Sequence, residues 1–333
     1  MIRKGFWLSA AAWLITVWAL PGIAQTGSPQ LLVLEKEDKS LAIVNPETLK
    51  VVVRLPAGED PHEVAATEDG RRAYISNYGG FRIPQRTLSV VDLVAPKALP
   101  PVDLGPLRAP HGLDMVNGKL YFTAEGSKLI GSYDPNGQGV EWVLGTGQGR
   151  THMLKVKPDL TAIFTANMTS DSVSIFEPDK NSDSSGWRAT VIPVGKAPEG
   201  FDVSPDGKEL WAASHQDVVT IIDLATKKVT ATITTHTKFA NRLKFTPDGK
   251  RVLISDLGTG DLIVLDAVSR TEIKRISLGR GCAGILVPPD GSIAYVAVSP
   301  DSNVAVVDLK TYSVTGRIPT GKGPDGMAWA VRK

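Results

Sequence analysis

The sequence predicts an all-β fold, and three observations lead to that prediction. A segment containing Pro-Asp-Gly recurs every 42 residues, as SPDGKELWAAS from 204, TPDGKRVLISD from 246 and PPDGSIAYVAV from 288. The 333-residue chain contains 32 Gly and 23 Pro, the residues that most often mark turns. Between the turns, Val and Ile gather in short patches typical of strands. Repeats of this length made of strands predict a β-propeller.

Each repeat has the pattern of four strands. An apolar first strand leads into the Pro-Asp-Gly turn, and a second strand, a third strand ending in Val-Val-Asp or Ile-Ile-Asp, and a fourth strand follow. Asp-Gly pairs suit the positive backbone angles that tight turns require. The first strands are expected to begin at Pro61-His62, Pro110-His111, Thr151-His152, Pro198-Glu199, Ala240-Asn241, Cys282-Ala283 and Pro324-Asp325. The sequence therefore predicts a seven-bladed β-propeller with four antiparallel strands per blade.

The two ends of the chain complement each other. The segment GPDGMAWAVRK (323–333) has no later strands, whereas LLVLEKEDKSLAIVNPETLKVVVRL (31–55) lacks a first strand. We expect the C-terminal strand to pair with the N-terminal three, because closing the ring removes exposed sheet edges.

The first 24 residues predict a secretory signal peptide, which leaves residues 25–333 as the propeller domain. Arg3 and Lys4 precede an apolar run, and Gly22-Ile23-Ala24 offers small residues for cleavage. We therefore expect a periplasmic or secreted protein with no stable membrane insertion after cleavage. A retained membrane anchor is the alternative, although the run is short for a membrane span.

Charge and cysteine content exclude some classes of protein. The chain has 37 basic and 35 acidic residues, and removing Arg3 and Lys4 leaves 35 against 35. A near-neutral chain without a basic cluster argues against nucleic acid as a partner. Cys282 is the only cysteine, so no internal disulfide can form. We expect its thiol to be buried and inert.

The repeats resemble those of the YVTN/YncE-like family of exported seven-bladed propellers. The segment VGKAPEGFDVSPDGKELWAAS (194–214) carries the resemblance most clearly, and the similarity extends over the whole mature chain. This resemblance implies the fold and says little about activity, because propellers host unrelated chemistries.

The second residue of each predicted first strand should lie at the mouth of the central channel. Three of the five histidines occupy this position. Because imidazole and carboxylate groups bind divalent cations, we expect His62, His111, His152 and Glu199 to hold a metal ion, with Mg, Mn, Zn, Fe and Cu all open. Asn241, Asp325 and, from the ends of second strands, Tyr78 and His215 are expected to contact a small-molecule ligand. Alternatively, these are polar rim residues in contact with water.

One blade resembles the catalytic blade of the virginiamycin B (streptogramin) lyase family. In PHGLDMVNGKLYFTAE (110–125), His111 and Glu125 have the fourteen-residue spacing of that family's catalytic histidine and glutamate, and His62 matches a further Pro-His. The resemblance implies acid–base elimination beside magnesium. In addition, GPDGMAW (323–329) resembles a strand of the SMP-30/gluconolactonase propellers, where Asp325 would match a residue serving metal-dependent hydrolysis.

Two functions remain open at this point. The first is a metal-dependent lyase or lactone-opening enzyme with His111 and Glu125 as catalytic residues. The second is a non-catalytic platform that binds a protein, a glycan or a redox partner on the same face. The chain has no Cys-x-x-Cys-His motif, so it attaches no c-type haem of its own.

Overall fold

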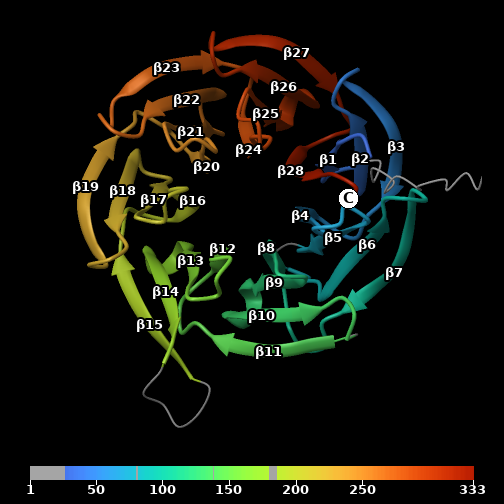
Figure 1. Ribbon diagram of the computed structural model, residues 1–333, viewed down its shortest axis with the longest axis horizontal. Helices are drawn as coiled ribbons and strands as arrows, with labels where there is room; N and C mark the ends of the chain where they lie inside the picture. Colours follow the sequence, from blue (N-terminus) through green and yellow to red (C-terminus); the bar gives the residue numbers. More distant parts are fainter. Residues whose placement is uncertain (1–26, 80–81, 138, 180–185) are drawn as a thin grey trace, which may run out of the picture.

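A computed structural model describes residues 27–79, 82–137, 139–179 and 186–333. Its strands form seven four-stranded antiparallel sheets, arranged as blades around a central channel (Figure 1). The predicted seven-bladed propeller is therefore confirmed, whereas the expected signal peptide lies outside the described residues. Within the described ranges, no helix is long and apolar enough to cross a membrane.

The blades are numbered here in chain order, each from its innermost strand outward. Blade 1 contains β28 (Pro324–Ala330), β1 (Gln30–Glu35), β2 (Ser40–Asn45) and β3 (Lys50–Pro56). Blade 2 contains β4 (Pro61–Ala66), β5 (Arg72–Asn77), β6 (Thr87–Asp92) and β7 (Lys97–Asp103). Blade 3 contains β8 (Pro110–Val116), β9 (Lys119–Ala124), β10 (Leu129–Asp134) and β11 (Gly139–Gly145). Blade 4 contains β12 (Thr151–Val156), β13 (Ile163–Asn167), β14 (Ser172–Pro178) and β15 (Trp187–Pro193).

The remaining three blades carry the most regular repeats. Blade 5 contains β16 (Pro198–Val203), β17 (Glu209–Ser214), β18 (Val218–Asp223) and β19 (Lys228–Thr234). Blade 6 contains β20 (Ala240–Phe245), β21 (Arg251–Asp256), β22 (Asp261–Asp266) and β23 (Glu272–Ser277). Blade 7 contains β24 (Cys282–Leu286), β25 (Ile293–Val298), β26 (Asn303–Asp308) and β27 (Ser313–Pro319). Three short 3-10 helices follow second strands: η1 (Glu125–Ser127), η2 (Met168–Ser170) and η3 (Ser299–Asp301).

The repeated aspartates hold the turns. In the Pro-Asp-Gly turn of blade 5, the Asp206 carboxylate accepts hydrogen bonds from the Ser204 hydroxyl and the Lys208 backbone N–H, and Gly207 has a φ of 71°. At the end of the third strand of blade 6, Asp266 accepts the backbone N–H groups of the two residues after Ala267. These carboxylates satisfy donors that tight turns leave free, which explains why Asp recurs at both places.

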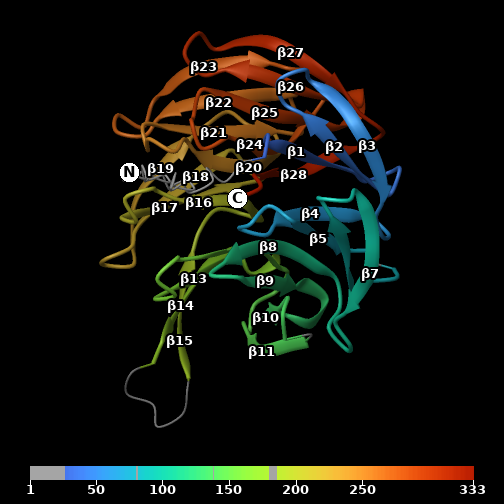
Figure 2. The ribbon, with the colours of Figure 1, turned by 45° about the vertical axis from the view of Figure 1, so that its right-hand side comes forward.

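The ring closes as the sequence predicts. β28 pairs antiparallel with β1, with Leu31 opposite Trp329 and Val33 opposite Met327. Figure 2 shows β28 beside β1 in blade 1, although the two strands come from opposite ends of the chain. Apolar clusters between neighbouring blades hold the ring together, such as the cluster that joins Leu253 of blade 6 to Val296 of blade 7. Stability therefore depends on closure as well as on each sheet.

A break in strand pairing aims side chains at the channel mouth. In every blade the pairing register of the innermost strand shifts directly after its first residue; in blade 3, Pro110 pairs with Ala124 but Leu113 pairs with Phe122. Two residues, His111 and Gly112, thus lie opposite a single residue, which is the pattern of a β-bulge. The bulge turns one side chain of each blade toward the channel axis.

Glycine in the bulge lets neighbouring inner strands approach closely. A Cβ atom added at Gly284 would lie 2.1 Å from the backbone oxygen of Asp325, and one added at Gly326 would lie 2.2 Å from that of His62. No real side chain tolerates such distances. The glycines therefore bring the first residues of adjacent blades together around a narrow channel.

Candidate functional site

The upper ring, defined as the bulge residues of the seven blades, lies at one end of the channel. Its members are His62, His111, His152, Glu199, Asn241, Ala283 and Asp325. All are buried except His62, which is half-buried. The alternative that these are water-exposed rim residues is therefore wrong for the other six, because the narrow channel encloses them.

Hydroxyl groups opposite the bulges fix the spacing between neighbouring ring residues. The Thr123 hydroxyl accepts the Gly112 N–H at 2.8 Å and donates to the His152 carbonyl oxygen at 2.8 Å. Ser255 does the same in blade 6, where it accepts the Arg242 N–H and donates to the Ala283 carbonyl oxygen at 2.5 Å. Each bridge joins two adjacent inner strands, so ring residues are held by the backbone as well as by their side chains.

Three histidines and a tyrosine form an aromatic cluster on one side of the upper ring. The ring centroids of His111 and His152 are 3.7 Å apart, and those of His62 and His111 are 4.8 Å apart. Tyr78 lies against both His62 and His111, at 4.8 and 5.5 Å. These distances agree with the prediction that the three histidines lie close together.

Glu125 bonds to His152 rather than to His111. Its Oε2 atom accepts a hydrogen bond from His152 Nδ1 at 2.8 Å, and its Oε1 atom accepts from Arg150 Nε at 2.6 Å and from the Tyr78 hydroxyl at 3.0 Å. Among the described residues, neither ring nitrogen of His111 has a hydrogen-bond partner. The two expected catalytic residues, His111 and Glu125, therefore share no hydrogen bond, and Glu125 instead orients the neighbouring His152.

Glu199 is the second carboxylate that faces His152. Its Oε1 atom lies 3.6 Å from His152 Nε2, and its Oε2 atom accepts a hydrogen bond from His215 Nε2 at 2.6 Å. The Asn241 amide also donates to Glu199. His215 and Asn241, expected as ligand contacts, therefore bind Glu199 in this structure.

Arg242 spans the channel beneath the upper ring. Its guanidinium donates to Glu199 at 2.9 Å and to Glu63 of blade 2, and lies 3.8 Å from Asp325 of blade 1. Lys36 holds the other oxygen of Asp325 at 3.0 Å and lies 3.4 Å from His62 Nε2. One buried arginine from blade 6 thus connects three other blades across the channel.

Sequence reasoning missed Arg242, Arg150 and Lys36. A signal for Arg242 exists, because four of the seven blades have glycine directly after the ring position, where blade 6 has arginine. Arg150 and Lys36 lie in loops between strands, where the sequence pattern does not fix which way a side chain points.

The environments of His111 and His152 move their pKa values in opposite directions. Burial and the neighbouring His152 lower the pKa of His111 well below its ordinary value. Burial would also lower the pKa of His152, but the facing carboxylates of Glu125 and Glu199 outweigh it and raise that pKa. The pKa of one imidazole is thus lowered and that of its neighbour is raised. Such a divergence between adjacent titratable groups is typical of acid–base sites.

The arrangement does not provide a preformed metal site. No group of three or more His, Cys, Asp or Glu side chains in the described part of the chain is placed to hold a metal ion. The rings of His111 and His152 are stacked with only 33° between their planes, so their in-plane lone pairs do not point at one position. Glu199 is already bound by cationic and amide groups. Binding of a divalent metal ion by His62, His111, His152 and Glu199 stays a prediction. The proton transfers proposed for this site do not depend on that ion.

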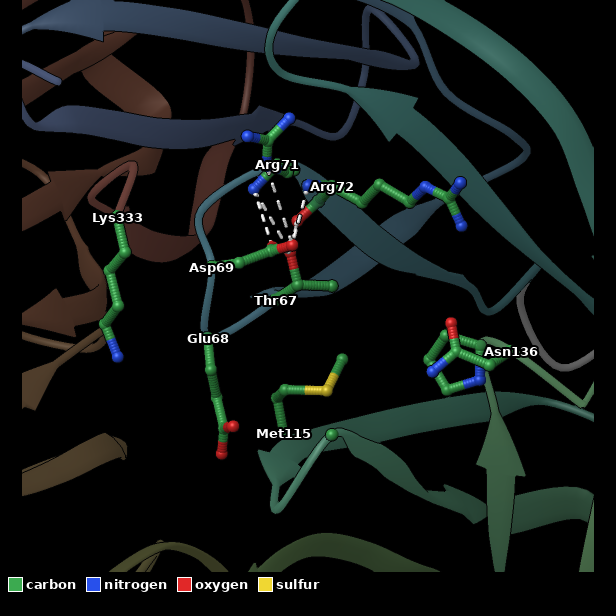
Figure 3. Close-up of a pocket in the computed structure, with 10 residues that line it drawn as sticks. Thr67, Glu68, Asp69, Arg71, Arg72, Met115, Asn136 and Lys333 are labelled. Carbon is green, nitrogen blue, oxygen red and sulfur yellow. Dashed lines mark hydrogen bonds and ion pairs between the residues drawn. The ribbon is translucent and has the colours of Figure 1, made fainter. Parts of the chain in front are cut away.

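A separate cavity opens at the opposite end of the inner strands. It has a volume of about 490 Å³ and is lined by the turn that follows β4, by Met115 and by Lys333 (Figure 3). Asp69 is held within that turn by the Thr67 hydroxyl at 2.6 Å and by the Arg71 N–H at 3.0 Å. The Asp69 carboxylate, which lines this cavity, is therefore engaged in holding its own turn.

Cys282 is buried at the start of β24, and burial raises the pKa of its thiol to about 12. The expectation of a buried thiol is confirmed, and the raised pKa favours the unreactive protonated form.

The fold and the upper ring together define the class: a seven-bladed β-propeller with a cluster of titratable side chains at one end of its channel. No protein-family model matches the chain, and no curated protein matches it significantly. The resemblance to YncE-like propellers and to streptogramin lyases therefore stays a resemblance.

Solved structures share the fold at low sequence identity. A functionally unknown protein from Desulfotomaculum acetoxidans aligns with a TM-score of 0.74 at 14% identity, covering 90% of this chain and 98% of its own. Hydrazine synthase from Kuenenia stuttgartiensis aligns with a TM-score of 0.73 at 19% identity, covering 89% and 99%. A proposed 6-phosphogluconolactonase from Bacteroides uniformis aligns with a TM-score of 0.73 at 15% identity, covering 91% and 100%. At these identities the similarity demonstrates the fold alone.

Proposed function

We propose that the protein is an acid–base enzyme that opens a small lactone or ester by elimination or ring opening at the upper ring. The observation that carries this proposal is the adjacent pair His111 and His152, whose ring centroids are 3.7 Å apart and whose pKa values are shifted in opposite directions. General acid–base catalysis needs one group that accepts a proton and another that donates one, both within reach of the substrate.

His111 acts as the base in this proposal. Its ring nitrogens have no hydrogen-bond partner among the described residues, so a lone pair is free to accept a proton from a carbon or a water molecule. His152 acts as the acid: its Nε2–H lies 3.6 Å from Glu199, longer than a hydrogen bond, and is free to protonate the departing oxygen. His111 takes one proton from the carbon or the water molecule, and His152 gives one proton to the departing oxygen. The number of protons on the reactants is therefore unchanged.

Glu125 positions the acid. It holds His152 Nδ1 at 2.8 Å and thereby fixes the ring orientation and stabilises the imidazolium form, as carboxylates beside catalytic histidines generally do. Tyr78 and Arg150 in turn fix Glu125. Contacts thus run from Glu125 to His152 and on to His111, which links the two residues fourteen positions apart through the next blade.

The experiment is a hydrolysis and elimination screen of the purified protein with gluconolactone, 6-phosphogluconolactone and cyclic depsipeptides. His111→Ala and His152→Ala should each reduce kcat by about 100-fold or more, because each removes one partner in proton transfer. His236→Ala is the matched control, since that histidine is highly exposed and does not belong to the upper ring. If wild-type protein with an intact fold turns over none of these substrates, the enzyme proposal is overturned.

A non-catalytic binding platform is the second candidate. The burial of His111 and His152 favours it, because groups enclosed by their neighbours can hold a surface in shape without meeting a substrate. In that case the variants at His111 and His152 would lower the melting temperature and change no turnover.

A further inference from the structure

A second ring of side chains lies lower in the channel, at the position three residues after the upper-ring residue in each inner strand. Four of its seven members are charged. We name this set the lower ring; its members are Ala65, Asp114, Lys155, Asp202, Lys244, Leu286 and Ala328. Four successive blades, 3 to 6, thus present aspartate and lysine alternately. A cavity of about 150 Å³ lies in this part of the channel, lined by Asp114, Lys155 and Lys244, and by Arg242 above them.

Arg242 separates this cavity from the upper ring. Its guanidinium is bound to Glu63, Glu199 and Asp325 on three other blades, so it closes the channel between the two rings. The lower cavity is therefore reached from the opposite face, where Lys155 also lines a larger cavity of about 530 Å³. The lower ring belongs to a different compartment from the histidine cluster.

The two aspartates of the lower ring are already engaged. Asp202 accepts hydrogen bonds from the backbone N–H groups of Val203 at 3.0 Å and Phe245 at 3.1 Å, and it pairs with Lys155 at 2.9 Å. Asp114 accepts the Val156 N–H at 2.8 Å. Both carboxylates thus bind the backbone of the inner strands, and Asp202 also binds Lys155.

Lys244 differs from Lys155, because its charge reaches the carboxylates of Asp114 and Asp202 only at longer range. Its ammonium group makes no hydrogen bond or ion pair with any side chain in the described residues, although it lines the cavity beside Lys155. Lys244 is half-buried, so its ammonium keeps part of its water, but its three N–H donors lack a side-chain acceptor among the described residues. An oxyanion in the cavity would supply that acceptor and would also lie close to Lys155.

We propose that the lower ring binds a small oxyanion, inorganic phosphate or a small carboxylate, between Lys244 and Lys155. The cavity is large enough for one such ion and too small for a polymer. Glu63, which is bound to Arg242, and Asp114 also line this cavity, together with apolar side chains such as Leu113 and Met327. An anion there would therefore have the two lysines as partners and the Asp114 carboxylate as a nearby like charge, only partly screened by water.

The test is isothermal titration calorimetry of the full chain with inorganic phosphate, sulfate and acetate at constant chloride concentration. We expect saturable binding of one ion per chain, with the phosphate and acetate arms distinguishing the two sources of oxyanion. Lys244→Met should weaken binding by about tenfold or more, since it removes a charged hydrogen bond, whereas Lys244→Arg should retain most of the affinity.

Two controls separate this site from general charge effects and from the upper ring. Lys250→Met removes an exposed lysine from the same blade and should leave the affinity unchanged. His111→Ala should also leave it unchanged, so the outcome does not depend on the proposed enzyme activity. Absence of saturable binding to the wild-type protein, or equal affinity in Lys244→Met, would overturn the proposal.

Discussion

The upper and lower rings lie on the same seven inner strands, yet they handle charge differently. At the upper ring, side chains reach across blades: Glu199 holds groups from blades 4, 5 and 6, and Arg242, directly beneath the ring, binds Glu63 of blade 2. In the lower ring, the main ion pair joins immediate neighbours, Lys155 and Asp202.

The register shift explains the difference. Upper-ring residues lie in β-bulges, which turn their side chains toward the channel axis, where groups from several blades meet. Lower-ring residues lie in regularly paired strand, as Lys155 opposite Phe164 illustrates. Regular pairing places each lower-ring side chain beside those of the next blade. Asp202 forms its ion pair with Lys155, and Lys244 has no direct ion pair among the described residues.

The largest effect is expected where the two rings join. Arg242→Met would leave the carboxylates of Glu63, Glu199 and Asp325 without their shared cation, and removing one member of a buried ionic network typically costs about 3–5 kcal/mol. Chemical denaturation should detect this loss in the free energy of unfolding. Arg280→Met is the control, because that arginine is exposed and pairs only at the surface. A cost below about 1 kcal/mol for Arg242→Met would mean that the network adds nothing beyond packing.

A smaller effect is expected from Glu125→Gln, of order 1–2 kcal/mol, because the amide still accepts from His152 Nδ1 but no longer balances its charge. The raised pKa of His152 contributes stability that is fully present below its ordinary value of 6.5 and is lost as pH rises through the folded-state value. The lowered pKa of Glu125, which burial opposes and His152 brings about, contributes stability above 4.5 that is lost on acidification.

Both contributions are therefore complete between pH 4.5 and 6.5. The difference in melting temperature between wild-type protein and Glu125→Gln should be largest in that window and should shrink at alkaline pH. Thermal unfolding measured at several pH values checks this, and His236→Ala provides the matched histidine control. A difference that does not vary with pH would show that Glu125 does not act through the charge of His152.

The sequence was sufficient for the fold and for the membership of the upper ring. The 42-residue repeat and the unmatched strands at the two ends predict blade number and closure, because both follow from local patterns that the whole ring repeats. The ring position was also predictable, since Pro-His-Gly and its variants mark the same place in each blade. The partners within the ring were not.

Partner choice depends on side-chain direction across the channel, and no local pattern encodes it. The fourteen-residue spacing places His111 near the start of β8 and Glu125 directly after the end of its neighbour β9. The bulge turns His111 toward His62 and His152, whereas Glu125 faces the next blade. Arg242 lies 179 residues from Glu63, a separation at which only the closed ring brings two side chains together.

The smallest effect should distinguish the two lysines of the lower ring. Lys155→Met removes the side-chain partner of the buried Asp202, and we expect a loss of about 1–2 kcal/mol even though two backbone N–H groups still bind that carboxylate. Lys244→Met removes a charge that has no partner among the described residues, so we expect a change within about 0.5 kcal/mol in phosphate-free buffer, because no compensating interaction is lost. In saturating phosphate, the wild-type protein should gain stability that Lys244→Met does not, since only a ligand bound to the folded state shifts unfolding. Denaturant titrations of the wild-type protein and both variants, with and without phosphate, measure all six values. If both variants lose the same free energy of unfolding in phosphate-free buffer, Lys244 has a partner in solution. That result would contradict the difference between the two lysines.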